Sequence, residues 1–359
     1  MAEHKKKNIL VVASGTGGHL FPALSFSKVF TEAATDALQV NFLGTGRPLE
    51  STLVDKHGYP RFEYKITGVS KLGLSGILKF LLGLPSAWKS LRKLFADLEP
   101  VLVLGFGGYA TVLPLLMARL SGIPTVIFEA EKKAGLANQF LAYFVTEVAS
   151  AYATVQGVSR RVVEVGRILR PGLLGFQKQL APAVRRVLVM GGSQGCRSID
   201  LGMLAMSATL AKEGVEIWHQ SRPEHVELLR DKYKSVGLVA RVDSFIENPE
   251  EAYLWADLVV SRAGAGALLE ICVATLPAVL VPLPKAQEQF DNAKALEAVK
   301  KSLTVLEGDQ FDQRLEQAVL KFLEPDFYIS YAGAKPLDFN TEGAWKLSEV
   351  ALRQLEPLD

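Results

Sequence analysis

Strand-like runs rich in β-branched and aromatic residues alternate with longer, helix-length segments along the whole chain. In the first half these runs are residues 8–13, 39–43, 62–66, 101–104, 125–128 and 148–151. The rhythm starts again in the second half, at residues 186–190, 216–220, 240–243, 258–261 and 278–281. This alternation is typical of parallel sheets with helices on both faces. It predicts an α/β protein made of two doubly wound, Rossmann-like halves.

The rhythm breaks near residues 166–175, where glycines and Pro171 accumulate and the periodicity is lost. We expect a linker there. The predicted domains are residues 1–166 and 167–340, and a last amphipathic segment, 341–355, is expected to form a helix that packs back on the first domain. Two such halves imply a cleft between them, because ligands of open α/β sheets bind beyond the carboxyl ends of the strands.

Length, cysteine content and charge narrow the class of protein. A chain of 359 residues exceeds the size at which one core keeps growing. Cys196 and Cys272 are the only cysteines and have no ligand-like spacing, so neither a disulfide framework nor a zinc site is indicated. Residues 5–7 are lysines before an apolar run too short for a signal peptide, so we expect a cytoplasmic protein.

The net charge of +2 is unevenly distributed and gives no indication of a nucleic-acid partner. Residues 1–166 contain 18 basic and 12 acidic side chains, net +6, whereas the rest of the chain has net −4. The basic half is expected to bind an anionic partner such as a phospholipid surface.

Residues 101–118 carry no charge, which is also typical of a membrane span, but glycines at 105, 107 and 108 interrupt them. That pattern predicts a buried strand, a glycine loop and a helix starting near Tyr109 rather than a membrane span.

Three glycine-rich loops each follow a predicted strand and precede a predicted helix. They are Gly15–His19, with a helix expected from Pro22, Gly191–Gly195, and Arg262–Gly266, whose helix carries Glu270. Glycines allow the backbone to approach a ligand, and a helix N-terminus offers free N–H groups to an anion. Each loop alone is also compatible with a simple tight turn, but three at equivalent positions favour phosphate binding.

The loops do not match the dinucleotide or P-loop patterns. Leu20 occupies the sixth position of the first loop, and the run 39–43 does not end in an acidic residue, which disfavours an NAD enzyme. No Asp-x-Asp pair occurs, so an obvious magnesium-diphosphate bridge is missing. We therefore expect chemistry without a metal or another cofactor, with backbone N–H groups, helix dipoles and Arg170 stabilising the leaving group.

Six motifs, taken in their order along the chain, resemble those of the MurG family of UDP-N-acetylglucosamine transferases. They are Gly15–Leu24, Gly105–Tyr109, Ala134–Asn138, Gly191–Gly195, His219–Ser221 and Ser261–Gly264 with Glu270. The resemblance implies a GT-B fold, two Rossmann-like domains facing a cleft. It also implies inverting transfer of GlcNAc from UDP-GlcNAc to the C4 hydroxyl of MurNAc in lipid I, a polyprenyl-pyrophosphoryl-MurNAc-peptide, which gives lipid II for peptidoglycan synthesis.

The resemblance implies donor and acceptor residues. The donor set is Thr16, Gly17, Gly18, Arg170, Ser193, Gln194, Ile246, Ala265, Gly266, Glu270, Glu288, Gln289 and Asn292. Within it, residues 193 and 194 and the amides of 265 and 266 contact the diphosphate, the backbone of 246 reads the uracil, and Glu270 accepts hydrogen bonds from the ribose. The acceptor set is Gly15, Gly17, Gly18, Ser70, Gly107, Gly108, Tyr109 and Asn138.

His19 and Glu131 are the residues placed nearest the chemistry. An inverting transfer needs a base for the C4 hydroxyl proton, and imidazole has a suitable pKa. The alternative is that His19 only positions the acceptor. Glu131 stands where the family has an asparagine, so its charge near two pyrophosphates requires compensation by Lys132, Lys133 or a proton.

An apolar and basic segment between residues 72 and 95 suggests peripheral attachment to the cytoplasmic face of the cell membrane. Its proposed contacts are Ile77, Lys79, Phe80, Leu81, Trp88, Lys89 and Arg92. An ordinary core-facing helix is the alternative.

Ala267 and Glu288 also depart from the family pattern, so two other functions stay open. One is a UDP-sugar transferase that acts on another lipid acceptor, such as a diacylglycerol. The other is a UDP-sugar-binding homologue that has lost catalysis.

Overall fold

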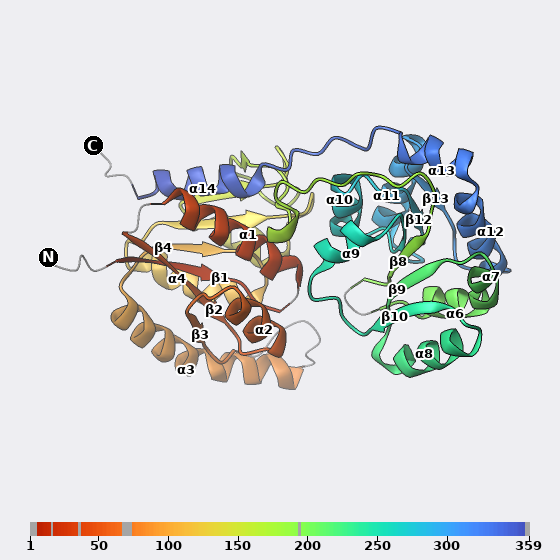
Figure 1. Ribbon diagram of the computed structural model, residues 1–359. Coiled ribbons are helices and arrows are strands. Elements are labelled where there is room, and N and C mark those ends of the chain that lie inside the picture. The colour runs from red at the N-terminus through yellow and green to blue at the C-terminus, as the bar shows by residue number, and fades with distance from the viewer. Residues whose placement is uncertain (1–5, 16, 35–36, 67–73, 193–194, 356–359) are drawn as a thin grey trace, which may run out of the picture. The chain divides into compact units, whose positions relative to one another are not determined.

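The computed structural model describes residues 6–15, 17–34, 37–66, 74–192 and 195–355, with the side chains of 74–82 left out. The chain forms two compact units: Met1–Pro171 with Phe339–Asp359, and Gly172–Asp338. Each unit contains one fully parallel sheet with helices on both faces (Figure 1). The predicted fold class is confirmed.

Unit 1 contains a seven-stranded sheet in the order β3-β2-β1-β4-β5-β6-β7. Its strands are β1 (Lys7–Val12), β2 (Leu38–Gly44), β3 (Arg61–Glu63), β4 (Pro100–Gly105), β5 (Thr125–Glu129), β6 (Glu147–Ser150) and β7 (Val163–Glu164). Its helices are α1 (Gly17–Ala33), α2 (Pro48–Lys56), α3 (Leu74–Leu98), α4 (Val112–Leu120), α5 (Leu136–Leu141) and α14 (Gly343–Arg353), with a 3-10 turn, η1, at Tyr109–Thr111.

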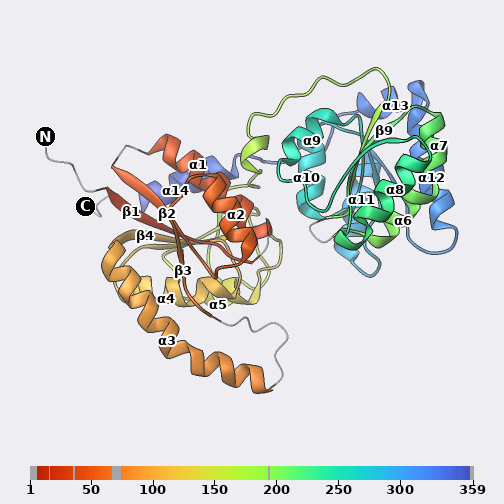
Figure 2. The ribbon, with the colours of Figure 1, turned by 60° about the horizontal axis from the view of Figure 1, so that its bottom comes forward.

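The two faces of this sheet bury alternate residues of β1, as the two-residue repeat of a strand requires. Ile9 and Val11 pack in a core with α1, α2 and α14, whereas Leu10 and Val12 pack in a second core with α3, α4 and α5. Figure 2 shows the sheet between these two groups of helices. The strand is therefore apolar on both faces, which is why it reads as a continuous hydrophobic run.

The last helix returns to unit 1 as a consequence of local backbone contacts. Arg167 donates its N–H to the Asn340 carbonyl at 2.7 Å, and Gly343 donates to the Arg167 carbonyl at 3.2 Å. A Cβ at Gly343 would lie 2.6 Å from the Gly166 carbonyl oxygen, so a side chain there would push the two segments apart. The contact places α14 on the face that also holds α1.

Unit 2 contains a six-stranded sheet in the order β10-β9-β8-β11-β12-β13. Its strands are β8 (Arg186–Met190), β9 (Glu216–Gln220), β10 (Val239–Asp243), β11 (Leu258–Ser261), β12 (Ala278–Leu280) and β13 (Ser302–Thr304). Its helices are α6 (Arg197–Ala205), α7 (Ser207–Lys212), α8 (Val226–Ser235), α9 (Pro249–Trp255), α10 (Ala265–Val273), α11 (Gln287–Ala298), α12 (Phe311–Leu323) and α13 (Pro325–Ala332). Two short 3-10 turns are η2 (Pro171–Leu173) and η3 (Pro223–His225).

Some predicted boundaries were wrong. Helix α1 begins at Gly17 rather than at Pro22, which lies inside the helix. Proline cannot donate a hydrogen bond to the carbonyl four residues earlier, which is why the sequence suggested a start there. The run 62–66 pairs only as far as Glu63, and the two short strands β7 and β13 were not predicted.

Candidate functional site

His19 lies in the first turn of α1, directly after the loop that follows β1. Its Nδ1 lies 3.0 Å from the Ser14 carbonyl oxygen. A carbonyl can only accept, so Nδ1 carries the proton in this contact and Nε2 of the neutral ring keeps its lone pair. His19 is half-buried. The imidazole therefore has a fixed orientation and one nitrogen able to take up a proton.

The glycine loop after β4 forms the seat of this imidazole. Gly107 and Gly108 have φ values of 90° and 82°, a region that residues with a side chain rarely adopt. A Cβ at Gly107 would lie 3.2 Å from the His19 Nε2, and one at Gly108 would lie 3.3 Å from its Cε1. The loop approaches the ring this closely because neither position has a side chain. Gly107 and Gly108 of the predicted acceptor set thus lie beside His19.

Asn138 and Glu131 lie on the loop and helix that follow β5, around the buried carboxylate of Glu129. Glu129 accepts hydrogen bonds from the Glu131 N–H at 3.0 Å, the Gly135 N–H at 3.1 Å and the Asn138 side-chain amide at 2.9 Å. The buried Oδ1 of Asn138 has no partner among the described residues. The Nδ2 of Asn138 lies 3.8 Å from the position of a Cβ on Gly107.

The side chain of Glu131 is exposed, and so are Lys132 and Lys133. The Lys132 ammonium lies 5.5 Å from the Tyr152 ring centroid. Glu129 holds the Glu131 backbone, so the loop position of Glu131 is defined even though its side chain faces solvent. A catalytic role for Glu131 stays a prediction.

In unit 2, tight backbone packing shapes the loop after β8. A Cβ at Gly191 would lie 2.3 Å from the Cys196 nitrogen, and one at Gly195 would lie 2.6 Å from the Arg222 nitrogen. The Gln220 side-chain amide donates to the Gly192 carbonyl at 2.9 Å and holds the loop against the end of β9. Ser193, Gln194, Thr16 and Ser70 lie outside the described residues.

The loop after β11 leads directly into α10, with Gly264 as the N-cap residue. Ala265 and Gly266 occupy the first turn, where backbone N–H groups have no partner within the helix. A Cβ would meet nothing within 4 Å at Gly264 or Gly266, so a side chain at either position would face open space. Ala267, which follows them, is half-buried and adds no hydroxyl group to this turn.

Arg262 was part of a predicted motif, but its structural role was not foreseen. Its guanidinium donates to the Val281 carbonyl at 3.1 Å and pairs with Glu307 at 2.7 Å. Glu307 also accepts a hydrogen bond of 2.6 Å from Ser198 in the first turn of α6. These contacts hold the segments after β11, β12 and β13 beside the start of α6, and thus fix the edge of the sheet where the glycine loops lie.

Five other predicted donor residues lie in unit 2, whereas Gly17 and Gly18 begin α1 in unit 1. Glu270 is buried in α10 and accepts a 3.0 Å hydrogen bond from the Tyr253 hydroxyl. Asn292 donates to the Ala263 carbonyl at 3.0 Å and so contacts the loop after β11. The Gln289 side-chain oxygen accepts from the Leu283 N–H at 3.0 Å. Ile246 is buried in the segment after β10, and Glu288 is exposed in α11.

Arg170 belongs to unit 1, where its guanidinium lies 3.8 Å from the Phe21 ring centroid on α1. This is a close cation-π contact. Its proposed contact with the donor diphosphate stays a prediction.

His219 belongs to a buried polar network behind the loop after β8. Its Nε2 lies 3.1 Å from Asp200, its Nδ1 accepts a 2.8 Å hydrogen bond from Tyr233, and His225 contacts the second Asp200 oxygen at 2.7 Å. Burial lowers the pKa of His219. Burial would raise the pKa of Asp200, but hydrogen bonds from the two histidines outweigh it and lower that pKa. His219 is therefore a neutral structural group, and His225, to which no role was given, supports it.

The predicted membrane segment coincides with α3. Ile77, Lys79, Phe80 and Leu81 lie in its first half, where side chains are not described. In its second half Ala87, Leu91 and Phe95 face the core, whereas Lys89 and Arg92 are exposed and Trp88 is half-buried. This half of the helix therefore combines a core-facing side with an exposed basic side.

Exposed apolar side chains also occur on α4 and around α5, which the sequence did not indicate. Leu120, Leu136 and Tyr143 are 77%, 84% and 73% exposed. A groove lined by Trp88, Arg92 and Leu120 joins α3 to the end of α4. Among the described residues, none of the helices has the length and apolar character needed to span a bilayer. Within the same part of the chain, no three His, Cys, Asp or Glu side chains gather as a metal site would require.

Comparisons with known proteins match both halves of the chain to one family of glycosyltransferases. Residues 9–150 match the glycosyltransferase family 28 N-terminal domain, and residues 186–338 match the family 28 C-terminal domain. A UDP-N-acetylglucosamine--N-acetylmuramyl-(pentapeptide) pyrophosphoryl-undecaprenol N-acetylglucosamine transferase from Pseudomonas entomophila is 38% identical over 296 residues, 81% of each chain. The transferase of that name from Pseudomonas syringae pv. tomato is 37% identical over 80% of this chain and 81% of its own length.

Solved structures give the same result. Acinetobacter baumannii MurG matches with a TM-score of 0.67 and 26% identity over 97% of this chain and 99% of its own. A UDP-glucosyltransferase from Polygonum tinctorium has a TM-score of 0.65 at 14% identity, over 99% of this chain and 100% of its own, and shares the fold.

Proposed function

This chain belongs to the MurG family of glycosyltransferases, and we propose that it transfers N-acetylglucosamine from UDP-N-acetylglucosamine to the C4 hydroxyl of the N-acetylmuramyl group of lipid I, forming lipid II. Curated relatives that match over four-fifths of the chain are named for this donor and this acceptor. The observation that carries the proposal is the position of His19: its imidazole is oriented by the Ser14 carbonyl and packs against two glycines at the carboxyl edge of the sheet.

In the proposed reaction, His19 acts as the general base. The C4 hydroxyl oxygen forms a bond to the anomeric carbon while the bond from that carbon to the UDP oxygen breaks. UDP leaves with the electron pair, and the hydroxyl proton moves to Nε2 of His19. Attack from the face opposite the leaving group inverts the anomeric centre and gives a β-1,4 linkage.

Unit 2 is the proposed donor-binding part. Ala265 and Gly266 lie in the first turn of α10, where backbone N–H groups have no partner within the helix, and such a helix start suits a diphosphate. The buried carboxylate of Glu270, oriented by Tyr253, is suited to accept hydrogen bonds from ribose hydroxyls. The loop containing Ser193 and Gln194 is proposed to complete the diphosphate site.

His19→Ala separates the base role from a positioning role. Loss of the base is expected to lower kcat by about 100-fold or more with little change in the affinity for UDP-GlcNAc. Rapid-quench kinetics with titrated donor measures both quantities. An equal loss in turnover and donor affinity would assign His19 to binding.

An acceptor panel tests the reaction itself. We expect transfer to lipid I and none to a diacylglycerol. Transfer only to the diacylglycerol would refute the proposal and favour the other lipid-acceptor enzyme. Donor binding without turnover, with activity restored by Glu131→Asn, would identify a homologue that has lost catalysis.

Unit 1 is also proposed to bind the cytoplasmic face of the cell membrane as a peripheral protein. Exposed Lys89 and Arg92 flank half-buried Trp88 on α3, which suits an anionic headgroup region. The double variant Lys89→Glu, Arg92→Glu is expected to lose cosedimentation with phosphatidylglycerol vesicles. Arg353→Glu, on α14 at the opposite face of the sheet, is the matched control and is expected to bind normally. Equal binding by all three proteins would contradict this surface.

A further inference from the structure

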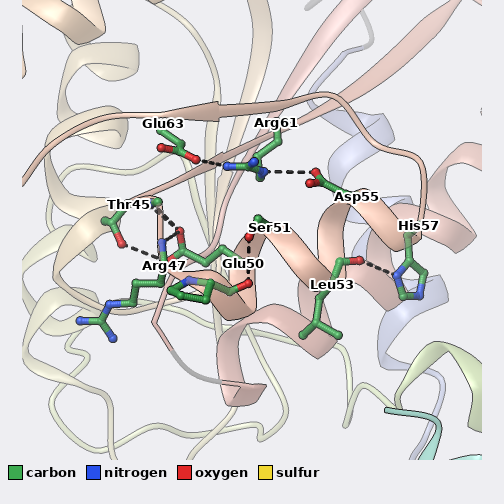
Figure 3. Close-up of polar contacts among 11 residues, drawn as sticks. Thr45, Arg47, Glu50, Ser51, Leu53, Asp55, His57, Arg61 and Glu63 are labelled. Carbon is green, nitrogen blue, oxygen red and sulfur yellow. Dashed lines mark hydrogen bonds and ion pairs between the residues drawn. The ribbon is translucent and has the colours of Figure 1, made fainter.

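A buried carboxylate joins the first two strand-end loops of unit 1. Glu50, in the first turn of α2, is 1% exposed. It accepts backbone N–H groups from Gly15 at 3.0 Å, Thr45 at 2.7 Å, Gly46 at 2.9 Å and Arg47 at 3.2 Å. The Thr45 hydroxyl adds a further hydrogen bond at 3.0 Å. Figure 3 shows the Glu50 carboxylate turned toward this loop.

This arrangement leaves little freedom to the loop after β2. A Cβ at Gly44 would lie 2.4 Å from a Glu50 oxygen, so the carboxylate fits against a position without a side chain. Hydrogen bonds to an ionised group are stronger than those between neutral groups. The loop is therefore fixed relative to Gly15 and to the start of the helix that carries His19.

The fixed loop presents the side chain of Arg47 to both acceptor loops. The Arg47 Nη1 lies 3.3 Å from the position of a Cβ on Gly15. Its Nη2 lies 3.5 Å from the hydroxyl of Tyr109, which follows the His19-contacting glycines. Arg47 is exposed, and among the described residues no carboxylate forms an ion pair with its guanidinium.

Arg61 provides a contrast on the same side of the sheet. Its guanidinium pairs with Asp55 at 3.2 Å and also with Glu63 (Figure 3). Two carboxylates thus neutralise Arg61, whereas Arg47 keeps its charge at the glycine loops. The difference indicates that Arg47 is placed to meet an anion from outside the protein.

We propose that Arg47 binds the pyrophosphate of the lipid-linked acceptor and that Glu50 is the positioning residue that holds it there. This inference rests on the proposed function, because it takes the acceptor to be a sugar pyrophosphate. The planar guanidinium suits paired phosphate oxygens, and the N-terminus of the 17-residue helix α1 adds a positive dipole end at the neighbouring loop.

Acceptor kinetics test the role of Arg47. Arg47→Ala is expected to raise the KM for lipid I about tenfold or more, since it removes a charge-assisted contact. The KM for UDP-GlcNAc and the melting temperature are expected to stay within about twofold and 1 °C of wild type, the scale of an exposed substitution. Arg47→Lys is expected to restore part of the affinity. Arg61→Ala is the matched control and leaves the KM for lipid I unchanged.

A second measurement distinguishes failure of this inference from failure of the proposed function. Inorganic pyrophosphate is titrated into the full chain by calorimetry with saturating UDP present, so that the donor site is occupied. We expect weaker binding to Arg47→Ala than to wild type and Arg61→Ala. Normal pyrophosphate binding and normal KM for lipid I in Arg47→Ala would overturn the inference while the function stands. Absence of transfer to lipid I would refute the function, and the calorimetry would still decide whether Arg47 binds pyrophosphate.

Glu50→Gln tests the positioning role. The amide keeps one acceptor oxygen but replaces the other with a donor that faces the loop N–H groups. We expect the KM for lipid I to rise as in Arg47→Ala, with the KM for UDP-GlcNAc unchanged. Combining the two substitutions is expected to add little, because Glu50 acts through Arg47. Fully additive losses would show that Glu50 has only an independent structural role.

Discussion

The variant Gly107→Ala tests most specifically whether the glycine loop after β4 positions the imidazole of His19. The added Cβ places a residue with a side chain at φ 90°, which costs roughly 1–2 kcal/mol of folding free energy. It also lies 3.2 Å from the His19 Nε2, so the ring has to shift by a few tenths of an ångström. Since a misplacement of about 1 Å costs on the order of 100-fold in rate, we expect kcat to fall several-fold to tenfold.

Gly122→Ala is the matched control for this experiment. Gly122 has a φ of 73°, but a Cβ there meets nothing within 4 Å. Both variants are therefore expected to lose similar stability in urea titrations, and only Gly107→Ala is expected to lose turnover at saturating UDP-GlcNAc and lipid I. Equal kcat values in the two variants would refute the idea that Gly107 is needed to seat the imidazole.

Three further predictions concern unit 2. Burial lowers the pKa of Lys301 in the folded protein to about 8, from 10.5. Between these pH values the unfolded chain keeps the Lys301 proton and the folded protein loses it, so the free energy of unfolding rises with pH. Lys301→Met should abolish that rise in urea titrations. Glu270→Gln should raise the KM for UDP-GlcNAc about tenfold and leave the KM for lipid I unchanged, whereas an unchanged donor KM would remove Glu270 from the ribose site. Asp200→Ala should cost more than about 2 kcal/mol of unfolding free energy because it leaves Nε2 of buried His219 without a hydrogen-bond partner, and Asp200→Asn should cost less. Equal losses would contradict that reasoning.

The main strands could be predicted because they are buried on both faces. Residues 258–260, for example, form a continuous apolar run, and together with Ser261 they form β11 with the predicted bounds. β7 and β13 have two and three residues, too few to produce a pattern. The start of α1 was predicted at Pro22 because proline is typical of the first turn of a helix, whereas the helix begins at Gly17.

The glycine loops could be placed because parallel strands bring their carboxyl ends to one edge of a sheet. The side chains that hold these loops in place could not be predicted. Glu50 accepts a hydrogen bond from Gly15, which is 35 residues away in the sequence, and Ser198 donates one to Glu307, which is 109 residues away. Such pairings depend on how strands are ordered in the sheet, and a buried acidic residue looks like a surface one in a single sequence. Arg47 was missed for the same reason, because only its neighbours distinguish it from Arg61.

A structure of the full chain with UDP-GlcNAc tests the central claim most directly, namely that unit 2 holds the donor while unit 1 carries the base. We predict the diphosphate at the N–H groups of Ala265 and Gly266, the ribose hydroxyls at Glu270 and the uracil at the backbone of Ile246. A nucleotide that contacts none of these unit 2 positions would contradict the account.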